Sequence, residues 1–142
     1  MGCDRPVVSR RVEKPTHIFV FPGRSAARAK ATLVQFVGDP TRSIYRVAVS
    51  CGAGDDFLKD SARAGADVLL TGEARFHRGL ESEALGIALI TAGHHATERI
   101  GVEDLAGRIA ASFPGLNAWP SRAERDPFRP VPIGAPGQAE LD

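Results

Sequence analysis

Four short apolar runs, rich in β-branched residues, most constrain what this chain can fold into. Glycine-containing turns follow each run, and the runs cover residues 33–37, 44–49, 67–72 and 87–90. Segments with apolar residues at helical spacing follow the last three runs. Short strands that alternate with helices are typical of a sheet whose faces are covered by helices. We therefore predict an α/β fold, in which a short sheet is covered by helices.

The intervals between these runs, and the segment after the last, carry the predicted helices. Their apolar residues are Phe57, Leu58 and Ala62 in the first, Phe76, Leu80 and Ala84 in the second, over residues 73–85, and Val102, Leu105, Ile109 and Phe113 in the third. The 142 residues suffice for one domain with a hydrophobic core, which we assign to residues 32–128. Residues 129–142 form a polar tail rich in Pro and Gly, and we expect it to be disordered.

Residues 1–31 are a poorly defined N-terminal segment. Residues 1–16 are polar, contain two prolines and are expected to be poorly ordered. A strand-like run follows over residues 17–21, and residues 24–31 are rich in Ala and Arg and have the composition of two helical turns.

Composition limits the class of protein and its partners. An apolar content of 43% and a charged content of 25% are typical of a soluble globular protein. The net charge is +1, with acidic and basic residues interspersed, so we expect no nucleic-acid partner. The longest apolar runs are too short to span a membrane, and we see no signal peptide. Two cysteines are too few for a disulfide framework, and we expect a cytoplasmic protein.

His94 and Glu98 are the strongest candidates for metal ligands. They follow the predicted strand 87–90, and α/β sheets usually bind ligands at the carboxyl ends of strands. If a helix begins at His94, the two side chains lie on one face about 5–6 Å apart at Cβ, within reach of one divalent cation. A helix start with an acidic residue favoured by the helix dipole explains the same spacing, and two donors alone do not complete a site.

Glu73 and His77 repeat this spacing after the preceding predicted strand. A helix capped by Thr71 that carries a surface histidine accounts for them equally well. Gly52-Ala53-Gly54 follows another strand, and such a turn can present N–H groups to an anion or serve only to reverse the chain. Cys51, beside this turn, is either a reactive thiolate or a small buried residue.

Taken together, these segments resemble the second half of the NGG-one interacting factor three-like family, which are dinuclear-metal proteins also known as GTP cyclohydrolase type 2 homologues. The resemblance extends from about Leu33 to Phe128. Its motifs are Val37-Gly38-Asp39-Pro40, Arg46-Val47-Ala48-Val49, Gly52-Ala53-Gly54, Ala64-Gly65-Ala66-Asp67, Thr71-Gly72-Glu73, His77, Gly93-His94 with Glu98, and Asp126-Pro127-Phe128.

This resemblance implies a fold of two related halves, a ring-shaped hexamer, and a pair of divalent metal ions between the halves. Residues 32–128 would then be the C-terminal lobe. His94 and Glu98 match the metal-binding histidine and glutamate of that lobe. Glu73 and His77 match pocket residues near the metals, with catalytic acid–base or supporting roles. The resemblance does not identify the metal, and zinc, iron and manganese are the candidates.

The sequence lacks a counterpart of the family's N-terminal half. Before Leu33 its only histidine is His17, where the family has a tandem-histidine motif and, later, an aspartate. We therefore expect a truncated metal-binding protein whose dinuclear site is completed by another chain, either a neighbouring subunit of a homo-oligomer or a separately encoded N-terminal half. A metal-dependent, cyclohydrolase-like hydrolase activity would require that completion. The alternative is a non-catalytic assembly module that has lost this activity, and a nucleotide-binding domain using Gly52–Gly54 is a third hypothesis.

Overall fold

The computed structural model describes residues 9–17 and 31–130, which form five strands and three α-helices. The strands are β1 (Ser9–His17), β2 (Gln35–Val37), β3 (Ser43–Val49), β4 (Val68–Thr71) and β5 (Ala88–Thr91). A 3-10 helix, η1 (Asp55–Phe57), leads into α2 (Leu58–Arg63), and α3 (Phe76–Leu85) and α4 (His94–Ser112) follow later in the chain.

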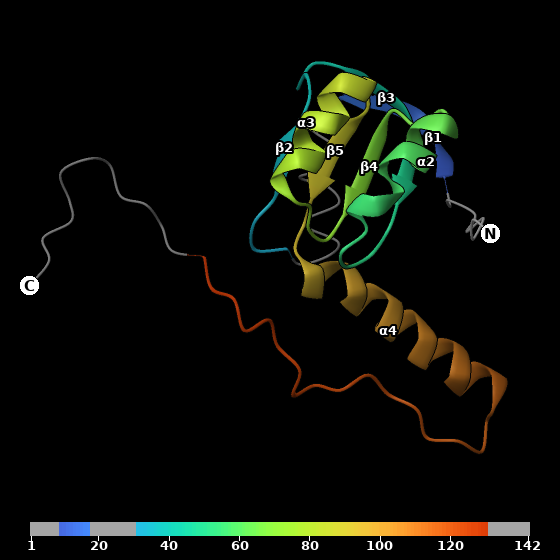
Figure 1. The fold of residues 1–142 in the computed structure, drawn as a ribbon. Coiled ribbons are helices and arrows are strands. Elements are labelled where there is room, and N and C mark those ends of the chain that lie inside the picture. The colour runs from blue at the N-terminus through green and yellow to red at the C-terminus, as the bar shows by residue number, and fades with distance from the viewer. Residues whose placement is uncertain (1–8, 18–30, 131–142) are drawn as a thin grey trace, which may run out of the picture.

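All five strands form one sheet, in the order β1-β3-β4-β5-β2. The three central strands are parallel, and the edge strands β1 and β2 run antiparallel to their neighbours. Figure 1 shows α2 and α3 against one face of this sheet, while α4 extends away from the sheet at the end where β4 and β5 finish. The parallel arrangement places the carboxyl ends of β3, β4 and β5 at one edge, where the site described below is formed.

The core consists of two apolar clusters, one on each face of the central strands. Alternate residues point to opposite faces, as the pleat of a strand requires. Cross-strand neighbours Val47, Val68 and Ala88 belong to one cluster, with Ile44 and Ile90. Their successors belong to the other cluster, which includes Leu58 of α2, namely Ala48, Leu69 and Leu89. Burial on both faces explains why β4 and β5 are continuous apolar runs rather than alternating ones.

The predicted α/β class and the four predicted strands are confirmed, with boundaries that shift by one or two residues. The predicted strand at residues 17–21 and the helical turns at 24–31 lie almost wholly outside the described residues. The expectation of disorder over 129–142 concerns residues of which only 129 and 130 are described, neither in a helix or strand.

Strand β1 lies in a segment where the sequence indicated no regular structure. It pairs with β3, and the register shifts between Arg11 and Thr16, an interval that contains Pro15. Proline cannot donate a ladder hydrogen bond and is therefore confined to edge strands and irregularities of this kind. Pairing along the backbone places these polar residues in the sheet, and that pairing leaves no hydrophobic pattern in the sequence.

Two of the predicted helices form with their apolar stripes exposed. Phe76 and Leu80 of α3 have 83% and 54% of their surface exposed, and Leu105 of α4 has 55%. The helical spacing of these residues therefore predicted the two helices correctly, and in the described part of the chain these side chains are largely exposed. None of the helices in this part is long and apolar enough to cross a membrane.

Candidate functional site

Three loops meet at the carboxyl ends of the parallel strands. The loop after β3 contains Gly52, whose carbonyl accepts hydrogen bonds from the N–H groups of Gly72 and Glu73 after β4, at 2.9 and 3.1 Å. The N–H of Gly93, after β5, donates to the carbonyl of Gly72 at 2.9 Å. Main-chain bonds therefore join all three loops before any side chain contributes.

Two buried threonines add side-chain hydrogen bonds at the place where these loops meet, which we call the loop crossing. The Thr71 hydroxyl donates to the carbonyl of Gly52 and accepts from the N–H of Gly54, each at 3.0 Å. The Thr97 hydroxyl accepts from the N–H of Gly52 at 3.1 Å. Thr71, the last residue of β4, thus bonds the loop after β3 rather than capping α3. Because the N–H groups of Gly52 and Gly54 already have partners, this glycine turn does not present them to an anion, and the structure argues against a phosphate loop.

Gly52 and Gly72 lie at the loop crossing, where neighbouring atoms leave no space for a Cβ atom. A Cβ at Gly72 would lie 2.7 Å from the carbonyl oxygen of Gly52 and 2.9 Å from the Cα of His94. A Cβ at Gly52, whose φ is +63°, would lie 2.7 Å from Glu98 Oε1 and 3.0 Å from His94 Nε2. The bare backbone of Gly52 therefore leaves room beside the two predicted metal ligands.

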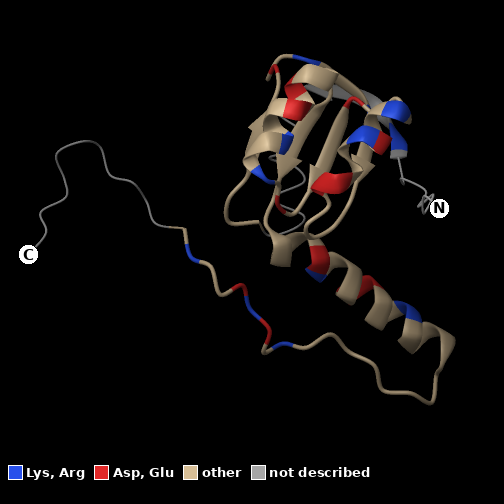
Figure 2. Ribbon diagram, in the orientation of Figure 1, with Lys and Arg blue, Asp and Glu red and all other residues tan. Residues whose placement is uncertain are grey.

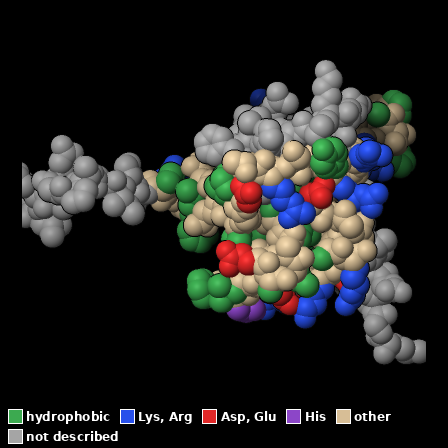
Figure 3. Space-filling view, turned by 90° about the horizontal axis from the view of Figure 1, so that it is seen from above, with side chains coloured by type: hydrophobic (Ala, Val, Ile, Leu, Met, Phe, Trp, Pro, Cys, Tyr) green, Lys and Arg blue, Asp and Glu red, His purple; other side chains and the backbone are tan. Residues whose placement is uncertain are grey.

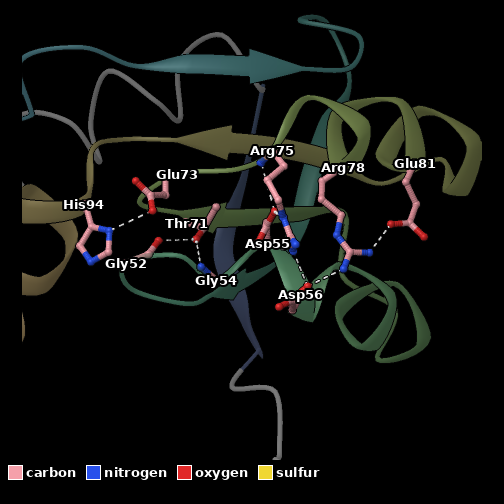
Figure 4. A network of polar contacts seen from close by, with 10 residues as sticks. All are labelled: Gly52, Gly54, Asp55, Asp56, Thr71, Glu73, Arg75, Arg78, Glu81 and His94. Atoms are coloured by element: carbon pink, nitrogen blue, oxygen red, sulfur yellow. Dashed lines mark hydrogen bonds and ion pairs between the residues drawn. The ribbon is translucent and has the colours of Figure 1, made fainter.

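His94 is the centre of a small polar cluster. Helix α4 begins at His94, as the predicted spacing required, and His94 Nε2 lies 3.1 Å from Glu98 Oε1. On the other side of the ring, Nδ1 lies 3.3 Å from Glu73 Oε1, a contact drawn in Figure 4. All three side chains are about half exposed. The hydrogen bond that the imidazole donates to Glu73, and the charges of both glutamates, raise the pKa of His94.

The geometry of this cluster limits what it can bind by itself. Glu73 and Glu98 contact opposite nitrogens of the imidazole, so the ring separates the two carboxylates and they cannot converge on one ion together with it. Residues 9–17 and 31–130 contain no group of three or more His, Cys, Asp or Glu side chains arranged to hold a metal ion. The arrangement instead offers two metal-ligating groups, His94 Nε2 and the Glu98 carboxylate. Glu73 is positioned to accept a hydrogen bond from the Nδ1–H of His94. A carboxylate in that position orients many metal-binding histidines.

The predicted pairing of Glu73 with His77 does not occur. Helix α3 begins at Phe76, and Arg75 before it has extended backbone angles of φ −72° and ψ 148°. Glu73 is therefore in the loop, where its N–H bonds Gly52, while His77 is exposed on the helix. The pair does not share a helix face because the loop is held by contacts distant in sequence. No hydrogen bond or ion pair joins His77 to another side chain in the described ranges.

Cys51 is exposed beside this cluster. Partial burial, together with the negative charge of Glu98, raises the pKa of its thiol. A raised pKa disfavours the thiolate form of Cys51.

A second polar network, which sequence reasoning missed, lies next to the cluster (Figure 4). Asp55 is 5% exposed and accepts hydrogen bonds from the N–H, Nε and Nη2 of Arg75 at 3.1, 2.8 and 3.2 Å. Asp56 bonds both Arg75 and Arg78, and Arg78 also bonds Glu81 at 2.6 Å. The hydrogen bonds from Arg75 lower the pKa of Asp55. The only sequence signal was opposite charges in the β3–α2 and β4–α3 connections.

Charges are mixed over the rest of the described surface. Figure 2 shows acidic and basic positions interspersed on the sheet, the helices and the C-terminal segment, and the face in Figure 3 has them side by side. This agrees with the near-zero net charge and gives no support to a phosphate-binding surface.

Comparisons with known sequences agree with this architecture. The sequence model of the family described as Duf34/NIF3 (NGG1p interacting factor 3) matches residues 7–127. A protein of Neisseria meningitidis serogroup B, named GTP cyclohydrolase 1 type 2 homolog, is 44% identical over 80 residues, covering 54% of this chain and 31% of the relative. A Bacillus subtilis protein of the same name is 31% identical over 99 residues, which are 67% of this chain and 26% of that relative. The matched part of the chain thus spans about a third or less of these relatives.

Solved structures show the same fold. A hypothetical protein of Staphylococcus aureus superposes with a TM-score of 0.76 at 23% identity, covering 87% of this chain and 42% of that one. A Bacillus cereus protein related to NIF3 gives a TM-score of 0.73 at 21% identity, with coverage of 87% and 35%. At these identities the likeness establishes the fold alone.

Proposed function

The chain belongs to the Duf34/NIF3 family, and on that premise we propose that it supplies His94 and Glu98 as two ligands of a divalent-metal site that another polypeptide completes. The single observation that carries the proposal is the contact of His94 Nε2 with Glu98 Oε1 at 3.1 Å, directly beside the bare backbone of Gly52. A neutral imidazole nitrogen and a carboxylate oxygen are both common ligands of zinc, iron and manganese.

Glu73 has the supporting role in this proposal. Its carboxylate accepts a hydrogen bond from the Nδ1–H of His94, which favours the tautomer whose Nε2 lone pair lies beside Glu98 and can bind a metal ion. The same carboxylate can hold a proton for a reacting group, so Glu73 remains our candidate for acid–base catalysis. His77 is a weaker candidate for that role, because no contact in the described part of the chain brings it to His94.

A metal-dependent hydrolase is the activity that such a completed site supports best. A bound divalent metal would lower the pKa of a coordinated water and polarise the bond under attack. The chain's own residues would hold the ion through His94 and Glu98 and keep the imidazole oriented through Glu73. The relatives' name suggests a cyclohydrolase-like reaction, which we propose only for the completed assembly.

The remaining donors would come from a neighbouring subunit of a homo-oligomer, such as a ring hexamer, or from a separately encoded N-terminal half. Two donors are fewer than the four to six that divalent ions usually take, and the chain spans under half of the solved relatives. We also propose a cytoplasmic location, since two cysteines indicate a reducing compartment.

A non-catalytic assembly module is the second candidate. The observation that favours it is the exposed apolar stripe of α4, where Val102 and Leu105 are 42% and 55% exposed. Large exposed apolar surfaces usually mark contacts with another protein. On this interpretation the chain would associate with another polypeptide without hydrolysing any substrate there, whatever metal is supplied.

Metal titration of purified chain tests the first candidate. We expect Zn²⁺ or Mn²⁺ to bind, and His94→Gln or Glu98→Gln to weaken binding by about 10-fold or more, because each removes a direct ligand. His95→Gln and Glu103→Gln, on the same helix, are matched controls that should bind as the wild type does. Equal affinity in all five proteins, or no binding even with a candidate partner present, would exclude His94 and Glu98 as ligands.

A further inference from the structure

Asp55 is a buried carboxylate whose contacts all lead to one residue of the neighbouring loop. Its side chain is 7% exposed, and its three hydrogen bonds come from the main-chain N–H and the guanidinium of Arg75. Figure 4 shows Arg75 reaching across from the β4–α3 connection to Asp55 at the start of η1. Replacing such a pair by apolar residues is often neutral or stabilising, so its contribution to folding stability does not by itself account for it.

The main-chain bond is the informative one. Because the N–H of Arg75 donates to Asp55, residue 75 stays extended and α3 begins only at Phe76. At the other end of the same short loop, the N–H groups of Gly72 and Glu73 donate to the carbonyl of Gly52. The loop that carries Glu73 is therefore held at both ends, and both anchors belong to the loop after β3.

We propose that Asp55 is a positioning residue that holds Glu73 against His94 by fixing the backbone of residue 75. If this anchor is lost, residues 73–75 are free to continue α3 towards its N-terminus, which would carry the Glu73 carboxylate away from its 3.3 Å contact with His94 Nδ1. The inference rests on the proposed metal site, because its effect is expressed through the orientation of His94.

Asp56 provides the matched comparison. It is the next residue and bonds the same arginine, as well as Arg78, but its side chain is 68% exposed and it accepts no main-chain N–H from the residues that the structure describes. Asp56→Asn therefore removes a charge from the same network without releasing the backbone of residue 75.

A double-mutant cycle with Zn²⁺ affinity as the readout tests the proposal. Asp55→Asn leaves one acceptor oxygen for three donors of Arg75 and turns an NH2 group towards them, which weakens the anchor. We expect Asp55→Asn and Glu73→Gln each to weaken Zn²⁺ binding by about 10-fold, since loss of a partner that orients a metal-binding histidine costs about 10–100-fold in affinity. Asp56→Asn should bind within about 2-fold of wild type, as expected for an exposed ion pair. In the Glu73→Gln background, Asp55→Asn should add less than about 2-fold, because its effect passes through Glu73.

Wild-type affinity in Asp55→Asn, or losses that multiply in the double variant, would overturn the positioning role while leaving the metal site intact. If His94→Gln does not weaken Zn²⁺ binding, the proposed metal site itself is excluded. If Asp55→Asn does not fold, Arg75→Gln replaces it in the same cycle. That variant keeps the main-chain N–H bond to Asp55 and loses only the guanidinium bonds. We therefore expect its Zn²⁺ affinity to stay within about 2-fold of wild type, and a loss of about 10-fold would overturn the assignment of the anchor to the main-chain bond.

Discussion

Two polar clusters lie side by side at the carboxyl edge of the sheet, and they differ in how completely their groups are satisfied. In the Asp55–Arg75 network a buried carboxylate has three protein donors. In the cluster of Glu73, His94 and Glu98, every side chain is about half exposed and each carboxylate has one ring nitrogen as its contact. The first arrangement holds loops in place. The second leaves oxygen and nitrogen lone pairs available to a ligand.

This difference indicates that the Asp55–Arg75 network contributes to stability, whereas the cluster of Glu73, His94 and Glu98 serves binding. Breaking a satisfied, buried network should lower the free energy of unfolding, because it leaves hydrogen-bonding groups without their partners. Exposed ion pairs contribute little to stability, so residues of the second cluster can be replaced at little cost to folding. The following predictions test that separation.

Gly72→Ala should have the largest effect, because Gly72 lies at the loop crossing that supports both clusters. Its Cβ would meet two main-chain atoms at under 3 Å, the Gly52 oxygen and the His94 Cα, and backbone cannot move aside as a flexible side chain can. We expect a loss of about 3 kcal/mol in the free energy of unfolding, as for severe overpacking, measured by urea denaturation. Gly101→Ala, in a helix with open space around the Cβ, is the control and should raise stability by about 0.5–1 kcal/mol. Equal effects at both glycines would show that the crossing is not tight.

Asp55→Ala and Glu98→Ala compare the two clusters directly. We expect Asp55→Ala to lower the free energy of unfolding by about 2 kcal/mol, since it removes the charged acceptor of three hydrogen bonds. Glu98→Ala should change it by less than about 0.5 kcal/mol. Thermal and urea unfolding of both variants in metal-free buffer measure the contrast. A larger loss in Glu98→Ala than in Asp55→Ala would reverse our assignment of structural and binding roles.

The smallest expected effect is on the pH dependence of stability, which should change in opposite directions with pH for the two clusters. Arg75 lowers the pKa of folded Asp55, so its stabilisation is present above the unfolded pKa of about 3.9 and is lost as pH falls through the folded value. Glu73 raises the pKa of folded His94, so that stabilisation is present below the unfolded pKa of about 6.5 and is lost as pH rises through the folded value.

Urea midpoints between about pH 3 and 8 test these signs. Asp55→Asn should remove part of the acid-side slope, and His94→Gln should remove part of the slope above about pH 6.5. A wild-type slope in His94→Gln over that range would mean that the contact with Glu73 does not form in solution.

The central strands could be predicted because their signal is local and strong. Ile44, Val68 and Ile90 are fully buried, and each lies in a run of mainly apolar residues in which Arg46 is the only charge within a strand. Strand β1 could not be predicted, because backbone pairing with β3 places its polar residues in the sheet. The stripe of Phe76 and Leu80 predicted a helix correctly but not its burial, since spacing reports periodicity and not what lies opposite.

The sequence by itself determined that His94 and Glu98 share one face, because a helix that begins at His94 brings residues four apart together wherever it lies. Only the tertiary structure decided that Glu73 joins them and that His77 does not. That outcome depends on the Asp55–Arg75 and Gly52–Thr97 bonds, which join residues 20 and 45 positions apart. Such contacts are set by the order of strands in the sheet, which no local pattern of residues encodes.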